Sequence, residues 1–426
     1  MSTPGQSGPA KRDELYARTI GRSGQLAAAK RRRQRLLVTL PAGLLLLALT
    51  GGVVAAVGLS GGPKHDSRVR RPHGAGSSTT TTAPGALVYR HFSPLSFTAV
   101  SLEQWWVLGE GAGCQGRPDC QEILQTTDGG QHFTKEPAPV QPASSTSRPG
   151  VRFANASDGY VYGPEIYATT DGGARWVRQS LPGPVIALEI GGDKAFALAC
   201  PAQQCGLYSE TVGTAGWTSI RLPTKGRPGY SQLSVSGSRI AVTEAVANGP
   251  KPVSFLLSTN GGASFVSRST PCFPGLGGAV FVPASQTDAL WAACPSGMEA
   301  TPYVSTDSGI SWHSASGWSS GSAPALCGQS SLGPCRPIFS NGLFVAPASG
   351  SEALALPAVS GAGLVLTTDG GSSYRLVYRG PSSDVLTWAG YSDTSRGYAI
   401  LSGQSGGGLL ETTDGGRAWR QVVFRS

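Results

Sequence analysis

Residues 126–133 read TTDGGQHF, and closely related octets recur through the rest of the chain. Five further copies are TTDGGARW at 169–176, STNGGASF at 258–265, STDSGISW at 305–312, TTDGGSSY at 367–374 and TTDGGRAW at 412–419. A seventh, degenerate copy can be aligned at 209–213, with Trp217 one residue later than the pattern requires. Internal repetition of this kind is typical of a fold assembled from equivalent units.

The spacing of the octets identifies the unit. Their third positions are 128, 171, 211, 260, 307, 369 and 414, so the gaps are 43, 40, 49, 47, 62 and 45 residues. Repeats of about 40–50 residues made of short strands are typical of β-propeller blades. The longest gap contains Cys327 and Cys335, which favours an insertion closed by a disulfide. We expect an all-β, seven-bladed propeller over residues 87–426, with six blades as the alternative.

The octet itself predicts a tight turn between two strands. Asp-Gly between apolar runs favours a hairpin because glycine adopts positive φ without steric cost. The third side chain and the preceding hydroxyl can accept hydrogen bonds from backbone N–H groups across the turn. The side chains expected to have this structural role are Asp128, Asp171, Asn260, Asp307, Asp369 and Asp414.

Two more strands precede each octet, such as 97–100 and 105–109 in the first repeat. Four strands per repeat complete a blade. Residues 87–92 (LVYRHF) are interpreted as an additional strand that helps close the ring. Neighbouring side chains on a strand face opposite ways, so we expect one of Trp105 and Trp106 in the core and the other exposed.

The octet resembles the Asp box, also called the bacterial neuraminidase repeat, whose pattern is Ser/Thr-x-Asp-x-Gly-x-x-aromatic. The resemblance covers residues 87–426 and departs at Asn260, which replaces Asp, and at Ser308, which replaces the first Gly. Asp boxes occur in sialidases, xyloglucanases, sortilin-type receptors and propellers similar to photosystem assembly factors. The resemblance implies a structural turn between the third and fourth strands of a blade and indicates little about activity.

A sialidase-like glycoside hydrolase is the enzymatic alternative. Resemblance to sialidases implies an arginine cluster, a tyrosine nucleophile with a glutamate partner, an aspartic acid and an early Arg-Ile-Pro motif. That motif is missing, since Arg336-Pro337-Ile338 has another order and lies late in the chain. Glycosidases use two carboxylates about 5–10 Å apart. Carboxylates outside the octets form no pair that the sequence places on one face; examples are Glu103, Glu165, Asp193, Glu244 and Asp384.

The segment 36–59 reads LLVTLPAGLLLLALTGGVVAAVGL and contains no charged residue. A helix of this length spans roughly 36 Å, enough for a hydrocarbon core of about 30 Å. Nine Lys and Arg residues precede it within 1–35, so the positive-inside rule places the N-terminus in the cytoplasm. We expect an uncleaved signal anchor, with a cleaved signal peptide as the alternative. Residues 60–86, rich in Ser, Thr, Pro and Gly, are expected to form a flexible linker.

All eight cysteines follow the apolar segment, at positions Cys114, Cys120, Cys200, Cys205, Cys272, Cys294, Cys327 and Cys335. An even number in closely spaced neighbours favours disulfides between sequence neighbours, as expected outside the cytoplasm. The gaps and the lack of nearby histidines do not match a zinc site. The pairing itself does not follow from sequence.

The net charge of +9 belongs to the N-terminal region. Residues 1–35 carry +7 and residues 61–72 carry +3, which leaves −1 from residue 73 onward. The propeller therefore lacks the basic surface that nucleic-acid binding requires. We expect a membrane-anchored, extracytoplasmic scaffold that binds a protein, peptide or glycan, with no catalytic, metal-binding or cofactor-binding residues.

Overall fold

The computed structural model describes residues 89, 91–112, 114, 120–142, 147–201, 204–223, 229–244, 253–296, 299–317, 325–327, 331–339, 345–357, 363–403 and 407–426. The chain divides into two units, Met1–Thr80 and Thr81–Ser426, and every described residue belongs to the second. The apolar segment 36–59 and the linker 60–86 lie outside the described residues. Within the described ranges, no helix is long and apolar enough to cross a membrane.

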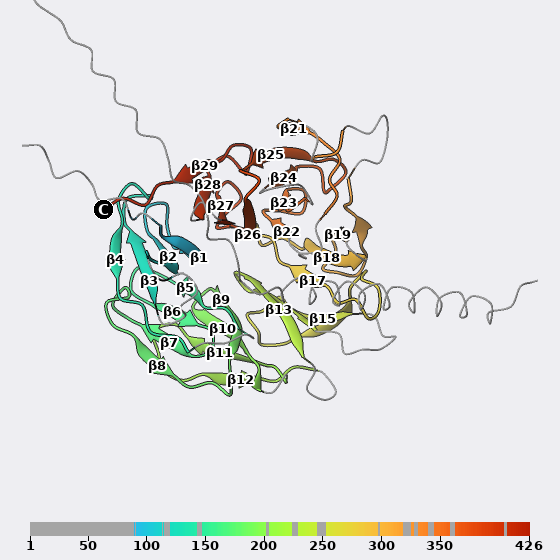
Figure 1. Cartoon of the computed structure of the whole chain (residues 1–426). Helices are drawn as coiled ribbons and strands as arrows, with labels where there is room; N and C mark the ends of the chain where they lie inside the picture. The colour runs from blue at the N-terminus through green and yellow to red at the C-terminus, as the bar shows by residue number, and fades with distance from the viewer. Residues whose placement is uncertain are drawn as a thin grey trace, which may run out of the picture. The chain divides into compact units, whose positions relative to one another are not determined.

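Seven antiparallel sheets form the described part of the chain (Figure 1). The first sheet contains β1 (Ser93–Ala99), β2 (Trp105–Glu110), β3 (Gln121–Thr126) and β4 (Thr134–Glu136), and the second contains β5 (Gly150–Phe153), β6 (Gly159–Tyr162), β7 (Ile166–Thr169) and β8 (Val177–Gln179). The third contains β9 (Val185–Gly191), β10 (Lys194–Ala199), β11 (Gly206–Thr211) and β12 (Thr218–Ile220), and the fourth contains β13 (Tyr230–Ser236), β14 (Arg239–Glu244), β15 (Ser254–Ser258) and β16 (Val266–Ser269). The last three are β17 (Ala279–Phe281), β18 (Leu290–Ser296), β19 (Glu299–Ser305) and β20 (His313–Ser314); β21 (Gly333–Pro334) with β22 (Val345–Pro347), β23 (Ala353–Ala355), β24 (Gly363–Thr367) and β25 (Arg375–Arg379); and β26 (Asp384–Tyr391), β27 (Gly397–Gly403), β28 (Gly408–Thr412) and β29 (Arg420–Val422).

The first strand of every blade lies at the centre of a ring. Neighbouring inner strands touch in the order β1, β5, β9, β13, β17, β22 and β26, and β1 also packs on β27 (Figure 1). The chain is therefore a seven-bladed β-propeller, as the octet spacing predicts. The sixth blade has a fifth strand, β21, from the insertion that the 62-residue gap predicted, and β21 pairs with the outer strand β25.

Both faces of each blade are buried, because each blade packs between two others. Trp105 lies against Tyr398 of the seventh blade, with ring centroids 5.3 Å apart, and Trp106 stacks on Phe153 of the second blade at 3.8 Å. Both indoles are fully buried. The expectation that one of them is exposed is wrong. Successive side chains of a propeller strand point to opposite faces of the blade, and each face packs against a neighbouring blade and not against solvent.

Side-chain hydroxyls connect the inner strands. Val151 and Phe153 of β5 donate their backbone N–H groups to Ser96 and Thr98 of β1 at 3.1 and 3.3 Å. The same kind of contact recurs between the fourth and fifth blades, where Val282, directly after β17, donates to Ser234 of β13 at 2.9 Å. These hydroxyls satisfy backbone donors that an inner strand, with one unpaired edge, would otherwise leave buried without a partner.

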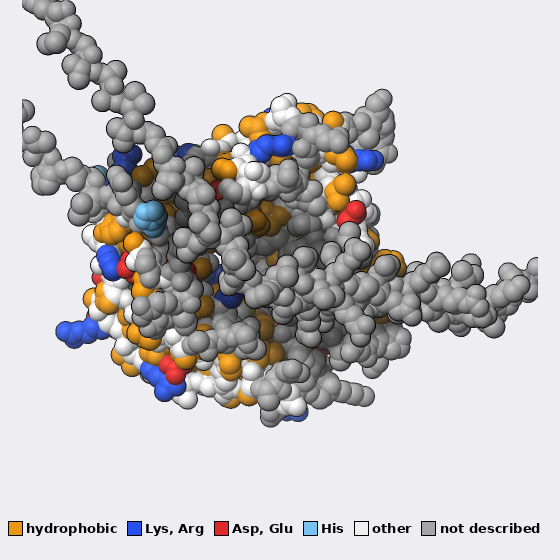
Figure 2. Space-filling view, in the orientation of Figure 1, with side chains coloured by type: hydrophobic (Ala, Val, Ile, Leu, Met, Phe, Trp, Pro, Cys, Tyr) orange, Lys and Arg blue, Asp and Glu red, His pale blue; other side chains and the backbone are white. Residues whose placement is uncertain are grey.

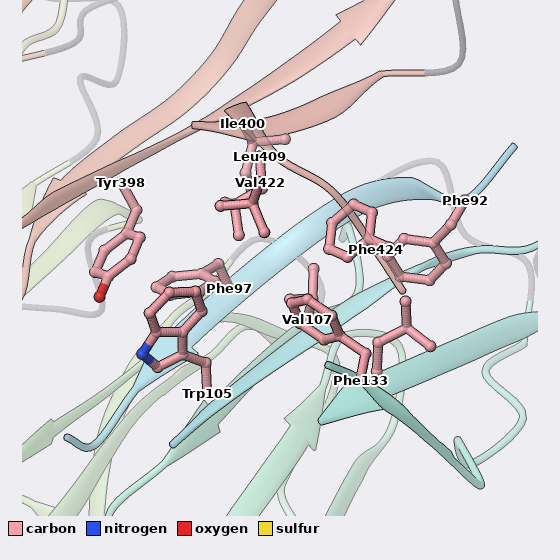
Figure 3. Close-up of a cluster of buried hydrophobic side chains, with 11 residues drawn as sticks. Phe92, Phe97, Trp105, Val107, Phe133, Tyr398, Ile400, Leu409, Val422 and Phe424 are labelled. Atoms are coloured by element: carbon pink, nitrogen blue, oxygen red, sulfur yellow. The ribbon is translucent and has the colours of Figure 1, made fainter. Parts of the chain in front are cut away.

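The ring closes without a strand shared between the first and last blades. Phe97, Trp105 and Val107 of the first blade pack on Ile400, Leu409 and Val422 of the seventh (Figure 3). Tyr89 donates its backbone N–H to the Phe424 carbonyl at 2.9 Å. Of the predicted closing strand at 87–92, the described residues Tyr89, His91 and Phe92 form no strand, and β1 begins at Ser93.

Candidate functional site

The six clear octets fold into one kind of turn between the third and fourth strands of their blades. In the first, the Thr126 hydroxyl accepts from the Gly130 N–H at 3.0 Å and donates to Asp128 Oδ1 at 2.8 Å. Asp128 Oδ1 in turn accepts from the backbone N–H groups of Gln131 and His132. Partial burial raises the pKa of Asp128, but these hydrogen bonds outweigh it and hold the pKa at about 2. The carboxylate is therefore occupied within the turn.

The other octet side chains make equivalent contacts. Oδ1 accepts the hydroxyl hydrogen bond two residues earlier and the backbone N–H four residues later at Asp171, Asn260, Asp307, Asp369 and Asp414. Asn260 reproduces the bonds of the carboxylates with a neutral amide. The turn thus requires an acceptor oxygen at this position and no negative charge.

Ser308, the other departure from the octet pattern, links two blades. It adopts φ = 58°, a left-handed conformation that ordinarily favours glycine. Its hydroxyl accepts from Arg239 Nη2 at 3.1 Å and donates to Asp288 Oδ1 at 3.1 Å. Arg239 is buried and also binds Asp288, at 2.9 Å.

The third blade replaces the octet hydroxyl with a carboxylate. The register of β10 and β11 pairs Ala195 with Glu210, and Glu210 is buried as the octet hydroxyls are. Glu210 Oε2 accepts from the Gly216 N–H at 3.4 Å. The degenerate copy therefore begins at Glu210, one residue after the start that the sequence alignment gave. Burial is the main cause that raises the pKa of Glu210.

The two faces of the propeller differ in how their loops are held. Because strands alternate in direction, the octet turns share one face, here called the octet face, with the hairpins between first and second strands. The opposite, or connection, face has the second-to-third hairpins and the blade-to-blade segments. All four disulfides join sequence neighbours, as Cys114–Cys120, Cys200–Cys205, Cys272–Cys294 and Cys327–Cys335. The first three lie at the connection face, and the fourth closes the insertion beside the sixth blade.

The inner strands of the third to seventh blades line a central channel of about 630 Å³. It extends along β17 from Gly278, before that strand, to Gln286, after it. Its polar side chains are mainly hydroxyls and amides, and its aromatic side chains are Phe281, Trp388 and Tyr391. A concave, mostly neutral cavity of this size is within the range of ligand sites in proteins.

Of the described residues that line the channel, Glu189 alone has a carboxylate. Its two oxygens accept from Nη2 and Nε of Arg152 at 2.9 and 3.1 Å. The third nitrogen of Arg152 donates to the carbonyl oxygens of Val151 and Phe97. Burial lowers the pKa of Arg152, but the attraction of Glu189 outweighs it, so the pKa stays above its ordinary value. The pair is a neutral cross-link between three blades.

The carboxylates considered from sequence lie elsewhere. Glu165 pairs with Arg178 at 2.6 Å on the second blade, and Glu244 accepts from the Ser254 hydroxyl on the fourth. Asp384 is buried at the start of β26, while Glu103 and Asp193 lie in turns on the octet face. No group of three or more metal-ligating side chains occurs among the described residues. The channel residues Glu189, Gln232 and Gln286, and the Arg152 that binds Glu189, were not identified from sequence, because they have no shared spacing or motif.

On the face shown in Figure 2, the described Lys and Arg residues are scattered and interspersed with apolar and acidic side chains.

Comparison with known proteins identifies the fold and no family. No family model matches the chain, and no curated protein matches it. Among solved structures, "YCF48 bound to D1 peptide" has a TM-score of 0.51 at 18% identity, covering 77% of this chain and 96% of that one. YCF48 from Cyanidioschyzon merolae has a TM-score of 0.48 at 17% identity, covering 76% and 96%. A prolyl endopeptidase has a TM-score of 0.52 at 10% identity, covering 80% of this chain and 50% of that one.

Proposed function

We propose that this protein is a non-catalytic scaffold that binds a protein or peptide segment in the central channel of its propeller. The observation that carries the proposal is that Glu189, the one carboxylate among the described lining residues, has both oxygens bonded to Arg152. Glycoside hydrolysis needs two carboxylates facing one substrate. Binding needs a shaped cavity with polar groups, and the channel provides both.

The likeness to a propeller solved with a bound peptide supports a peptide partner over a sugar. We further propose that the octets are Asp boxes, since their hydroxyl–carboxylate–amide pattern performs the structural role expected of that repeat. On this proposal the octet side chains stabilise the turns of the blades, and the inner strands bind the ligand.

We also propose that residues 36–59 anchor the protein in a membrane, with 1–35 in the cytoplasm, and that 60–86 link the anchor to the propeller outside. The apolar length and the charge asymmetry support this arrangement. Protease added to intact cells should remove the propeller, whereas full protection until the cells are lysed would contradict this orientation.

The enzymatic alternative is a diverged glycoside hydrolase, and it is tested with the purified full-length protein in mild detergent. We expect no turnover of a panel of chromogenic glycosides. Turnover that Glu189→Gln abolishes, but that the surface variant Glu299→Gln retains, would establish catalysis in the channel and reject the scaffold proposal.

A further inference from the structure

Four polar groups in the channel wall have no hydrogen-bond partner among the described residues. They are the side-chain amides of Gln232 and Gln286, the indole N–H of Trp388 and the hydroxyl of Ser392. Most hydroxyls beside them are already bonded: Ser234 accepts from the Val282 N–H at 2.9 Å, and Ser236 donates to the Ala284 carbonyl at 3.4 Å. Polar groups without a partner are therefore found at a few positions of the wall, and most of its hydroxyls are already hydrogen-bonded.

We propose that the channel recognises an uncharged, extended peptide segment, whose backbone amides pair with Gln232 and Gln286. This inference rests on the proposed scaffold function and names its ligand. A side-chain amide has both a donor and an acceptor, so it matches the N–H and C=O of a peptide group in one contact. Gln232 lies near the start of β13, whereas Gln286 lies in the turn after β17, beside Gly237 at the end of β13. The two amides therefore lie toward opposite ends of the channel, where one extended segment can reach both.

The backbone of Gln286 is fixed before any ligand arrives. It adopts φ = 53°, and its N–H donates to the Pro283 carbonyl at 3.3 Å. Left-handed backbone in a non-glycine residue is costly and persists where its surroundings fix it. A Cβ atom on Gly237 would lie 1.9 Å from Gln286 Oε1, so the glycine of the neighbouring blade makes room for this side chain. The backbone that carries this amide is thus set at one end of the channel.

The charge of the wall determines the charge of the ligand. Glu189 is the one described carboxylate in the lining and is neutralised by Arg152 at 2.9 Å. A charged side chain or a free terminus inside the channel would lose hydration without gaining a counter-ion, which is strongly unfavourable. An internal segment without Lys, Arg, Asp or Glu avoids that cost.

The position of Trp388 favours a peptide over a glycan. Sugars need an open ring face for stacking, but this indole packs close to Gly390 and lies 6.5 Å from the Phe97 ring. Its side chain is only partly exposed. Its N–H group has no hydrogen-bond partner among the described residues, and it is a donor suited to a peptide carbonyl.

The test measures binding of the full-length protein, in mild detergent, to capped hexapeptides in uncharged, acidic and basic sets, and to neutral oligosaccharides. We expect preference for the uncharged peptides. Gln286→Glu and Gln232→Glu should each weaken that binding about ten-fold, the usual effect of a lost hydrogen bond, and should improve binding of the basic set. The control Gln131→Glu, on the octet face, should match the wild type. Thermal melting establishes that each variant is folded.

Two results would overturn the inference. One is preference of the wild type for charged peptides or for oligosaccharides. The other is peptide binding that both channel variants leave unchanged while a partner is still captured from cells, which would retain the scaffold function and place its site elsewhere. Glycoside turnover, in contrast, would reject the scaffold function itself.

Discussion

At the scale of single residues, the octet aspartates act as acceptors and their charge is secondary. Asp369 Oδ1 accepts from the Ser373 N–H at 2.9 Å, and Asn260 makes the equivalent bond with Ser264 at 3.0 Å. We predict that Asp369→Ala lowers the free energy of unfolding by about 1–2 kcal/mol, because backbone donors lose their partner. Asp369→Asn should cost much less. Urea denaturation measures both, and equal losses would show that the charge itself is required.

Substitutions of Ser308 measure the cost of its left-handed backbone, because Ser308 combines that conformation with hydrogen bonds to the neighbouring blade. Ala and Gly in its place both lose the hydroxyl contacts to Arg239 and Asp288, but only Ala keeps the left-handed strain. We predict that Ser308→Ala is less stable than Ser308→Gly by about 1 kcal/mol. Denaturant midpoints of the two variants provide the comparison. Equal stabilities would mean that position 308 relaxes to another conformation.

Sequence analysis at this scale predicts the turn residues but not the channel residues. Asp128 and its equivalents stand in a repeated pattern whose turn chemistry is local, so eight residues suffice to predict the structure. Arg152 and Glu189 are 37 residues apart and meet because two inner strands are neighbours in the ring. Gln286 has a positive φ that no local glycine indicates. Such contacts depend on tertiary structure.

At the scale of the element, the third blade is the exception, and its buried Glu210 gives a pH test. Burial raises the pKa of Glu210, so the folded protein binds this proton more tightly than the unfolded chain. The stability that Glu210 contributes is therefore lost as the pH rises from the pKa of Glu210 in the unfolded chain through its higher pKa in the folded protein. We predict that Glu210→Gln raises the melting temperature at pH 7–8 and that this gain shrinks toward pH 4.

The matched control for this experiment is Glu299→Gln, at an exposed position of β19. It should change neither the melting temperature nor its pH dependence. A Glu210→Gln variant that is less stable than wild type at pH 7 would show instead that the blade needs the anion.

Strands were easier to predict than their surroundings. The apolar run at 105–109 predicted β2, because a short apolar run bounded by turn residues is typical of a strand. The rule that neighbouring strand side chains face opposite ways misplaced Trp105 and Trp106, since it cannot show that both faces of a blade are covered. The degenerate octet was misaligned by one residue because a glutamate took the position of a hydroxyl.

At the scale of the whole molecule, ring closure depends on packing between the two ends of the propeller. Phe424 is buried and its ring lies 5.0 Å from Phe92 and 5.1 Å from Phe133. We predict that Phe424→Ala lowers the free energy of unfolding by about 3 kcal/mol. The neighbouring Val423, 44% exposed, is the control, and Val423→Ala should change it by about 0.5 kcal/mol or less. Equal effects would mean that closure lies elsewhere.

The number of blades was predictable from sequence because the octets count the repeats directly. The contacts that close the ring could not be predicted, because residues 87–92 and the residues after the last octet belong to no octet. Their association appears in the contacts of Tyr89 and Phe424, which are separated by almost the full length of the propeller.

The most direct test of the scaffold is photo-crosslinking from inside the channel of the full-length protein in cells. A photoreactive residue at Thr387, an exposed channel position on β26, is compared with one at Thr134, exposed on the outer strand β4. We predict a discrete protein adduct from position 387 and none from position 134. Adducts from position 134 alone would contradict the claim that the channel holds the partner.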